Sequence, residues 1–354
     1  LFISSSLLGV SLMTNTYAIV LAAGQGTRMK SDLYKVLHPV CGKPMVAHVI
    51  DNIGKLGAER IVSIVGHGAE KVEETLGDKS EYALQKEQLG TAHAVQQAES
   101  LLGKLEGTTI VVCGDTPLIR AETMDALIAH HNELGAKATI LTAIADDPTG
   151  YGRVIRGEDN QVLRNVEQKD ATVDEQKVAE INTGTYCFDN KALFETLQKV
   201  DNNNAQGEYY LTDIVTLAVQ QGIEVIAEVT DDEWSVAGIN SKTDLSAIER
   251  VYQTRIAQKL LQQGVTLKDS ARLDVRGSLK AGKDVEIDVN CVFEGNVILG
   301  DNVKISANCV IKNATIKAGA QIAPFTHIDY TEIGENSRIG PFARLRPGTT
   351  LAAD

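Results

Sequence analysis

The sequence predicts an α/β domain with a largely parallel sheet, followed by a connector helix and then a parallel β-helix of hexapeptide repeats. Between residue 17 and about residue 230, short apolar segments alternate with longer amphipathic ones, as is typical of a sheet covered by helices. Beyond residue 280, apolar residues recur every six positions, a period that helices and simple strands do not have. The change of period predicts a change of architecture.

Four apolar segments predict buried strands in the first part of the chain, at 18–21, 61–65, 110–113 and 139–143. They are rich in apolar and β-branched residues and lack polar alternation, as expected for strands that are covered on both faces. Helix-length segments lie between them, for example 46–56 and 91–102.

A long helix is predicted after the sheet. Ser241 and Asp244 have the spacing of a capping box, with aspartate in place of the usual glutamate. Apolar residues then recur at helical intervals, and Gly264 provides a C-terminal stop. We expect this helix to connect two domains.

The six-residue repeat contains two five-residue steps, after Ile311 and after Ile328. Each apolar residue of the repeat is expected to point into the axial core of a coil. The repeat consists of Ile287, Phe293, Leu299, Ile305, Ile311, Ile316, Ile322, Ile328, Ile333, Ile339, Leu345 and Leu351.

These patterns predict domains at 15–240, 241–264 (the connector helix) and 265–354, the last an incomplete β-helix because the repeat is still running at Asp354. Residues 1–14 are expected to be a non-native or disordered leader. Their apolar part lacks the basic residues of a signal peptide and the length of a membrane span.

Composition excludes several classes of protein. The 354 residues carry 47 acidic and 34 basic side chains, a net charge of −13, which argues against a nucleic-acid partner. Five cysteines show no C-x-x-C spacing, so we expect free thiols and a cytoplasmic location rather than disulfides or zinc. No membrane association is expected.

A glycine-rich loop directly follows the first predicted strand, in Leu21-Ala22-Ala23-Gly24-Gln25-Gly26-Thr27-Arg28-Met29. Gly24 and Gly26 let backbone amides approach phosphate oxygens, and Arg28 supplies a charged, planar fork. The third glycine of a dinucleotide fingerprint and the Gly-Lys-Ser/Thr of a P-loop are both missing.

With Lys35 and the following Gly42-Lys43-Pro44-Met45, this loop resembles the sugar-1-phosphate nucleotidyltransferases, whose signature is L-x-x-G-x-G-T-R followed by P-K. Tyr34 stands where that family has proline, and Gln25 where lysine is common. The resemblance implies that Arg28 and Lys35 are catalytic and face a nucleoside triphosphate.

The segment from Gln85 to Thr91 resembles the nucleobase-reading loop of N-acetylglucosamine-1-phosphate uridylyltransferases. The alternative is that Gln85 and Gln88 are surface residues before a helix that Gly90 and Thr91 cap. The nucleotide-binding residues that the resemblance implies are Leu21, Ala22, Ala23, Gly24, Lys35, Gln85, Gln88, Gly90 and Thr91.

Asp115 follows the third predicted strand, where a carboxylate beside a phosphate loop is well placed for Mg²⁺. An ordinary turn before Thr116-Pro117 is the alternative. The resemblance supports the metal, because the family carries its Gly-Asp here, and it implies Asn240 as the second ligand. On the sugar-phosphate side it implies Gly152, Glu167, Asn182 and Asn240.

Taken together, residues 15–354 are similar to the bacterial bifunctional enzymes that acetylate glucosamine-1-phosphate and then uridylylate the product. This implies UTP and N-acetylglucosamine-1-phosphate as substrates, Mg²⁺, a left-handed β-helix, a homotrimer, and a role in peptidoglycan and lipopolysaccharide precursor synthesis. Acetyl-CoA is the implied co-substrate of the second site, of which Arg346 alone lies in this sequence. We therefore expect uridylyl transfer without acetyl transfer.

Two other interpretations remain open. The chain could be a sugar-1-phosphate nucleotidyltransferase with another nucleotide or sugar, since such relatives share the glycine loop and Asp115. It could also be a trimeric scaffold that binds a nucleotide without turning it over.

Overall fold

The structure is a computed structural model that describes residues 15–353. The predicted leader, residues 1–14, lies outside the described residues. The chain forms two compact units. The first contains the chain up to Gln25 together with Val49–Val236, and the second contains Gly26–His48 together with Ala237–Asp354. The segment Gly26–His48 therefore packs with the connector helix and the β-helix, although it is embedded in the sequence of the α/β domain.

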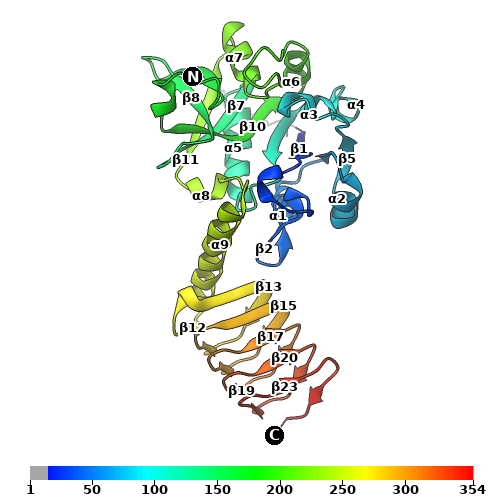
Figure 1. Cartoon of the computed structure of the whole chain (residues 1–354), viewed down its shortest axis with the longest axis vertical. Helices are drawn as coiled ribbons and strands as arrows, with labels where there is room; N and C mark the ends of the chain where they lie inside the picture. The colour runs from blue at the N-terminus through cyan, green and yellow to red at the C-terminus, as the bar shows by residue number, and fades with distance from the viewer. Residues whose placement is uncertain (1–14, 354) are drawn as a thin grey trace, which may run out of the picture. The chain divides into compact units, whose positions relative to one another are not determined.

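The first unit is built on one sheet with the strand order β11-β7-β10-β6-β1-β4-β5 (Figure 1). The four strands predicted from sequence are confirmed as β1, β4, β6 and β7. The bounds along this path are β1 Thr16–Ala22, β4 Arg60–Val65, β5 Glu81–Leu84, β6 Thr108–Cys113, β7 Ala138–Ile144, β10 Glu180–Asp189 and β11 Val225–Thr230.

The sheet is mixed, because β10 runs antiparallel to both β6 and β7. The other neighbours on this path are parallel: β1 with β4 and β6, β4 with β5, and β7 with β11. A small antiparallel extension, β8 (Gly152–Arg156) and β9 (Val162–Val166), joins the sheet through β10.

Helices connect these strands and bury their apolar faces in a core that contains Ile19, Val62, Val111 and Ile140. The segment predicted as one helix at 91–102 is divided into α3 and α4. The helices are α1 Met45–Ile53, α2 Ala69–Leu76, α3 Thr91–Gln96, α4 Glu99–Leu102, α5 Ala121–Glu133, α6 Asn190–Leu197, α7 Asp213–Gln220 and α8 Glu233–Val236. Short 3-10 turns follow α1 (η3, Gly54–Leu56) and α2 (η4, Gly77–Lys79), and η5 spans Glu175–Lys177.

The connector helix of the second unit is α9, Lys242–Gln262, and its predicted capping box is confirmed. The Ser241 side chain accepts a hydrogen bond from the Asp244 amide, and the Asp244 carboxylate accepts one from the Ser241 amide at 2.8 Å. The segment 26–48 adds two 3-10 turns, η1 (Thr27–Met29) and η2 (Lys35–Leu37), and a hairpin of β2 (Pro39–Val40) and β3 (Lys43–Pro44).

The rest of the second unit is a parallel β-helix, whose stacked coils are visible in Figure 1. Its strands are β12 Thr266–Leu267, β13 Leu273–Ala281, β14 Glu286–Ile287, β15 Cys291–Leu299, β16 Lys304–Ile305, β17 Val310–Lys312, β18 Thr315–Ile316, β19 Gln321–Ile322, β20 His327–Asp329, β21 Glu332–Ile333, β22 Arg338–Ile339, β23 Arg344–Leu345 and β24 Thr350–Leu351, with η6 at Ser270–Arg272.

The six-residue repeat explains the register of the coils. Three repeats complete one coil, so residues 18 apart pair in neighbouring coils, as Ile287 does with Ile305. A coil that contains a five-residue step is one residue shorter, so Ile305 pairs with Ile322, 17 residues on. The repeat residues from Ile287 to Ile333 are buried in one core, and the last three, Ile339, Leu345 and Leu351, pack against it.

All five cysteines are free thiols, as expected, and four of them are buried. None of the helices within residues 15–353 has the length and hydropathy that a membrane span requires.

Candidate active site

The first unit gathers its predicted site residues at one edge of the sheet. Strands β6, β1 and β4 are parallel neighbours, and their registers align Cys113 with Leu21 and Val65 with Ala22. The chain runs from β1 to β4 on one side and returns to β6 on the other, so the strand order changes direction at β1. Open α/β sheets bind ligands at such a switch point, outside the carboxyl ends of the strands.

Asp115 lies at this switch point, two residues beyond β6. The Gly114 amide just before it donates a hydrogen bond to the Leu21 carbonyl oxygen at 2.9 Å. This contact ties the Asp115 turn to the end of β1, where the glycine loop begins. The predicted proximity of the carboxylate to the Ala22–Gly24 backbone therefore has a structural basis in the β1–β6 pairing.

The Asp115 turn suits a metal ion whose other ligands are mainly phosphate oxygens and water. Within residues 15–353, no group of three or more His, Cys, Asp or Glu side chains is placed to hold a metal ion. Mg²⁺ commonly takes only one or two carboxylates from the protein and completes its shell with water and substrate phosphates. A single carboxylate beside the predicted phosphate-binding loop fits that chemistry.

The predicted nucleobase loop is braced against the end of β1. The Gln88 side-chain amide donates to the Ala23 carbonyl oxygen at 2.8 Å. Gln85 is buried, 3% exposed, and its amide nitrogen lies 3.1 Å from the Gly90 carbonyl oxygen and 3.1 Å from His93 Nδ1. The interpretation as a surface residue is therefore wrong for Gln85, whereas Gln88 is half-buried. Gly90 is the N-cap of α3, as that alternative had it.

A second segment, around Tyr209, holds the other side of this loop. The Tyr209 amide donates to the Leu89 carbonyl oxygen at 2.7 Å, and its carbonyl oxygen accepts from the Ala92 amide at 2.9 Å. The Thr91 hydroxyl accepts from the Leu211 amide at 2.9 Å. A Cβ on Gly90 would lie 2.4 Å from the Tyr209 carbonyl oxygen, so only glycine permits this approach.

Sequence reasoning assigned no role to the segment 202–213, and the structure shows that its backbone shapes the nucleobase loop. A pocket of about 490 Å³ adjoins the loop. It lies at the ends of β4 and β5 and is lined by Gly66–Glu70 and Leu84–Lys86.

Three of the four predicted sugar residues lie on or beside β8, β9 and β10: Gly152 in β8, Asn182 in β10 and Glu167 directly after β9. The fourth, Asn240, belongs to the second unit. Gly152 is paired in register with Asn182. The Asn182 amide nitrogen donates to the Tyr186 hydroxyl at 2.6 Å, and its oxygen accepts from the Gly184 amide at 3.1 Å. A Cβ on Gly184 would lie 2.8 Å from Cys113 Sγ, so this bulge of β10 lies against the end of β6, two residues before Asp115.

Acidic groups near the sugar residues have raised pKa values. Burial raises the pKa of Glu167, and the neighbouring Asp213, Asp170 and Glu208 carboxylates raise it further. Burial also raises the pKa of Asp213 to about 6. Hydrogen bonds donated by sugar hydroxyls would favour the charged form of such a carboxyl group and so lower its pKa.

Asn165 is a buried polar side chain that sequence reasoning did not select. It is 4% exposed, and neither its amide nitrogen nor its amide oxygen has a hydrogen-bond partner. A Cβ on Gly152 would lie 3.3 Å from the Asn165 oxygen. The sequence signal is a polar residue among the buried positions of β9, whose other buried residues are Val162 and Val166.

In the second unit, Gly26 makes room for Lys35. Gly26 has a left-handed backbone, φ 64° and ψ 40°, and a Cβ there would lie 2.4 Å from the Lys35 Cβ. The glycine thus determines where the Lys35 side chain lies, in addition to any contact with phosphate. Arg28, in η1, is exposed, and Met29 beside it is buried and anchors the turn.

Lys35, in η2, contacts a residue that lies just before α9. Its Nζ donates a hydrogen bond to Asn240 Oδ1 at 2.8 Å, and the Asn240 amide donates to the Asp244 carboxylate of the capping box at 2.9 Å. The two residues predicted to face phosphate and metal are therefore direct neighbours. Tyr34 just before has φ −57° and ψ 140°, so the proline of the family signature could follow the same backbone path here.

Arg346 follows β23 in the β-helix and is exposed. Its carbonyl oxygen accepts hydrogen bonds from the amide and the hydroxyl of Thr349, at 3.1 Å and 2.7 Å. The structure thus places Arg346 in a surface turn, and its predicted contact with an acetyl-transfer substrate stays a prediction.

Comparison with known proteins agrees with this geometry. The nucleotidyl transferase family model matches residues 17–242, and the model of the GMPPB C-terminal domain matches residues 275–354. The chain is 53% identical over 335 residues to the bifunctional protein GlmU of Geobacillus thermodenitrificans, covering 95% of this chain and 73% of that protein. It is 52% identical over 337 residues to GlmU of Paraburkholderia phymatum, covering 94% and 73%.

Family membership follows from two agreements. The nucleotidyl transferase match spans the sheet and its switch point, and the similarity to GlmU proteins continues through α9 into the β-helix. The chain is a nucleotidyltransferase and belongs to the family of bifunctional GlmU proteins.

Proposed function

We propose that this chain transfers a uridylyl group from UTP to N-acetylglucosamine-1-phosphate and releases pyrophosphate. The observation that carries the proposal is the edge of the sheet at β6, β1, β4 and β5. There the Asp115 turn, the glycine loop and a nucleobase loop braced by Gln85 and Gln88 follow neighbouring strand ends. The membership in the GlmU family supports this choice of substrates.

Each group has a distinct role in the proposed reaction. The phosphate oxygen of the sugar attacks the α-phosphorus of UTP in line, and the bond from that phosphorus to the pyrophosphate oxygen breaks. Such a transfer needs positioning and charge neutralisation more than covalent participation by the protein. Arg28 and Lys35 neutralise the triphosphate, and the Ala22–Gly24 amides orient it.

Asp115 and Asn240 are the proposed ligands of Mg²⁺, which when bound would neutralise phosphate charge. The Asn240 oxygen already accepts a hydrogen bond from Lys35, so it can serve the metal only through its second lone pair or by exchange of that contact. We therefore regard Asp115 as the principal ligand. Gly152, Glu167 and Asn182 are the proposed sugar-binding residues.

The test is to incubate the chain with UTP, magnesium and N-acetylglucosamine-1-phosphate and to follow pyrophosphate release. Asp115→Ala should lower the rate about a hundredfold or more, equivalent to about 3 kcal/mol of transition-state stabilisation. Near-normal turnover of this variant in magnesium would contradict the assignment of Asp115. Binding of UTP without any pyrophosphate release by the unmodified chain would favour the scaffold interpretation.

Substrate choice is tested with the same assay. If the loop from Gln85 to Thr91 reads uracil, UTP should support turnover much better than ATP or dTTP. Equal rates with all three would favour a nucleotidyltransferase of another specificity. Assembly into a trimer through the β-helix and a cytoplasmic location remain part of the proposal, and sedimentation of the purified chain tests the first.

A further inference from the structure

We propose that Glu249, on the connector helix α9, is a positioning residue for Lys35, and that it acts through the β2–β3 hairpin. The inference rests on the proposed function, because it assumes that Lys35 contacts the triphosphate. It concerns the segment Lys35–His48, which we call the strap. All the contacts that carry it lie inside the second compact unit.

The strap lies along α9 and is fixed to it at several points. Lys35 Nζ donates to Asn240 Oδ1 at 2.8 Å. Lys242 Nζ lies 3.2 Å from His38 Nδ1. Further along the helix, the ring of His48 lies against that of Tyr252, with centroids 5.1 Å apart. The segment that carries Lys35 therefore takes its position from α9.

The hairpin is the most strongly fixed part of the strap. Its two-residue turn has positive φ at both positions, 48° at Cys41 and 79° at Gly42, a turn type that favours glycine and asparagine. Glu249 accepts a hydrogen bond from the Cys41 amide at 2.6 Å. A charge-assisted bond of this kind is stronger than a neutral one and offsets the strain at Cys41.

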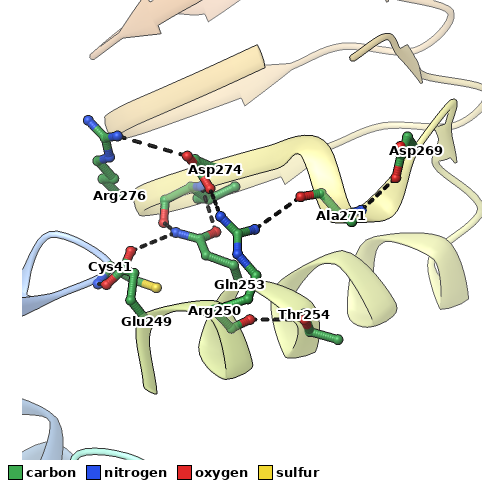
Figure 2. Close-up of polar contacts among 10 residues, drawn as sticks. Cys41, Glu249, Arg250, Gln253, Thr254, Asp269, Ala271, Asp274 and Arg276 are labelled. Carbon is green, nitrogen blue, oxygen red and sulfur yellow. Dashed lines mark hydrogen bonds and ion pairs between the residues drawn. The ribbon is translucent and has the colours of Figure 1, made fainter. Parts of the chain in front are cut away.

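Glu249 is itself held in place. The Gln253 side-chain amide donates to Glu249 Oε1 at 3.0 Å and to the Val275 carbonyl oxygen at 3.0 Å. The side-chain oxygen of Gln253 accepts a hydrogen bond from the Val275 amide at 2.8 Å. Gln253, which is 1% exposed, therefore pairs with both backbone groups of Val275. Figure 2 shows the Glu249 carboxylate between Cys41 and Gln253, with β13 beyond.

The tip of the hairpin touches the first coil of the β-helix. A Cβ on Gly42 would lie 2.8 Å from both the carbonyl carbon and the carbonyl oxygen of Arg276 in β13. The hairpin is thus confined by Glu249 on α9 and by the backbone of β13. Burial and the Glu249 carboxylate also raise the pKa of the Cys41 thiol, so the thiol stays neutral and adds no charge there.

Glu249 acts at a distance from Lys35. About 10 Å of helix separates Glu249 from Lys242 at the start of α9, and the contact partner of Lys35 is Asn240, which precedes that start. A change at Glu249 that leaves α9 in place therefore reaches Lys35 through the hairpin and η2, the turn that holds Lys35. The expected effect is a displaced Lys35 ammonium group, which lowers turnover.

Arg250 provides a matched control on the same helix. It donates to the Ala271 carbonyl oxygen at 3.2 Å and pairs with Asp274 at 2.8 Å, as Figure 2 shows. These contacts join α9 to the first coil, as those of Gln253 do, but they do not involve the hairpin. Loss of α9–coil contact alone should therefore appear in both variants.

The experiment compares Glu249→Ala, Glu249→Gln and Arg250→Ala in pyrophosphate release. Glu249→Ala should lower kcat roughly 10- to 100-fold, the cost expected for a group misplaced by about 1 Å, and should change the KM for UTP less. Arg250→Ala should stay within about twofold of the unmodified chain. Glu249→Gln keeps an acceptor for the Cys41 amide and should recover most of kcat.

A double-mutant cycle separates positioning from general destabilisation. In a Lys35→Ala background, Glu249→Ala should have little further effect, because the group that it positions is gone. Gly42→Ala, which displaces the hairpin without touching Glu249, should give the same pattern. Additive losses in the cycle, or an equal loss in Arg250→Ala, would overturn the proposal.

Failure of the proposed function is recognisable on its own, since the unmodified chain would then release no pyrophosphate. In that case hydrogen exchange of the strap amides is the readout. Glu249→Ala must accelerate exchange across 35–41 and Arg250→Ala must not, and any other result contradicts the proposed hairpin contact.

Discussion

The close approach of Gly26 to Lys35 gives a quantitative prediction for Gly26→Ala. The new Cβ would lie 2.4 Å from the Lys35 Cβ, whereas carbon atoms prefer about 3.5 Å or more. Either the loop or the Lys35 stem must therefore move by about 1 Å. Alanine in the left-handed region at φ 64° adds a backbone cost of about 1–2 kcal/mol.

The two effects are separable by a control with the same backbone strain. Gly57 has φ 68° and ψ 27°, and a Cβ there would meet nothing within 4 Å. Gly57→Ala should therefore lower the free energy of unfolding by about 1–2 kcal/mol and leave activity unchanged. Gly26→Ala should show at least that loss of stability, together with a kcat/KM for UTP that is about 100-fold lower.

Pyrophosphate release and urea unfolding, measured on the same preparations, provide the comparison. If Gly26→Ala keeps a kcat/KM within about twofold of the unmodified chain, then either Lys35 tolerates the displacement or it has no part in the reaction. Either outcome would refute the reasoning from the Gly26–Lys35 contact.

Three further predictions concern stability. Ile322→Ala, in the middle of the coil stack and 0% exposed, should lower the free energy of unfolding by about 2–5 kcal/mol, while Gln321→Ala beside it, which is exposed, should change it little. Asn165→Leu should raise the free energy of unfolding by about 1–3 kcal/mol, since it removes a buried amide without partners. A lower free energy of unfolding, measured with urea, would show that the Asn165 amide is hydrogen-bonded in the protein. Burial lowers the pKa of His131 to about 4 from 6.5. Between these pH values the folded state therefore binds fewer protons than the unfolded chain. The stability that is present above pH 6.5 is lost as the pH falls toward 4, by at most about 3 kcal/mol. His131→Gln should lose less stability than the unmodified chain between pH 7.5 and 4.5, and equal losses would contradict the assignment.

The parts of the fold that follow from local sequence patterns were predictable. Strands β1, β4, β6 and β7 are continuous apolar segments, and the β-helix core repeats at an interval that no other common structure has. β10 was not among the predicted strands, and its antiparallel direction departs from the largely parallel sheet that was expected, because a strand's direction depends on its neighbours. Nothing in Glu180–Asp189 distinguishes one direction from the other.

The site shows the same division. Asp115 and the glycine loop follow predicted strands, so their position at the carboxyl edge could be expected. Tyr209 contributes backbone groups, which leave no trace in side-chain patterns. Glu249 and Gln253 look like solvent-facing residues of an amphipathic helix, and only the tertiary contacts with Cys41 and Val275 reveal their role. The turn residues Cys41-Gly42 were the one available signal, since X-Gly between short extended segments indicates a hairpin.

The packing of Gly26–His48 with the C-terminal unit has a practical consequence. The polypeptide passes between the two units three times, at 25–26, 48–49 and 236–237, so the units are not joined by a single linker. A protein severed after Asn240 would retain every loop of the nucleotidyltransferase signature, yet the hairpin at Val40 and Cys41, which are buried, would lose its contacts with α9 and β13. Any excision of the first unit for separate study must therefore carry α9 and the first coil with it.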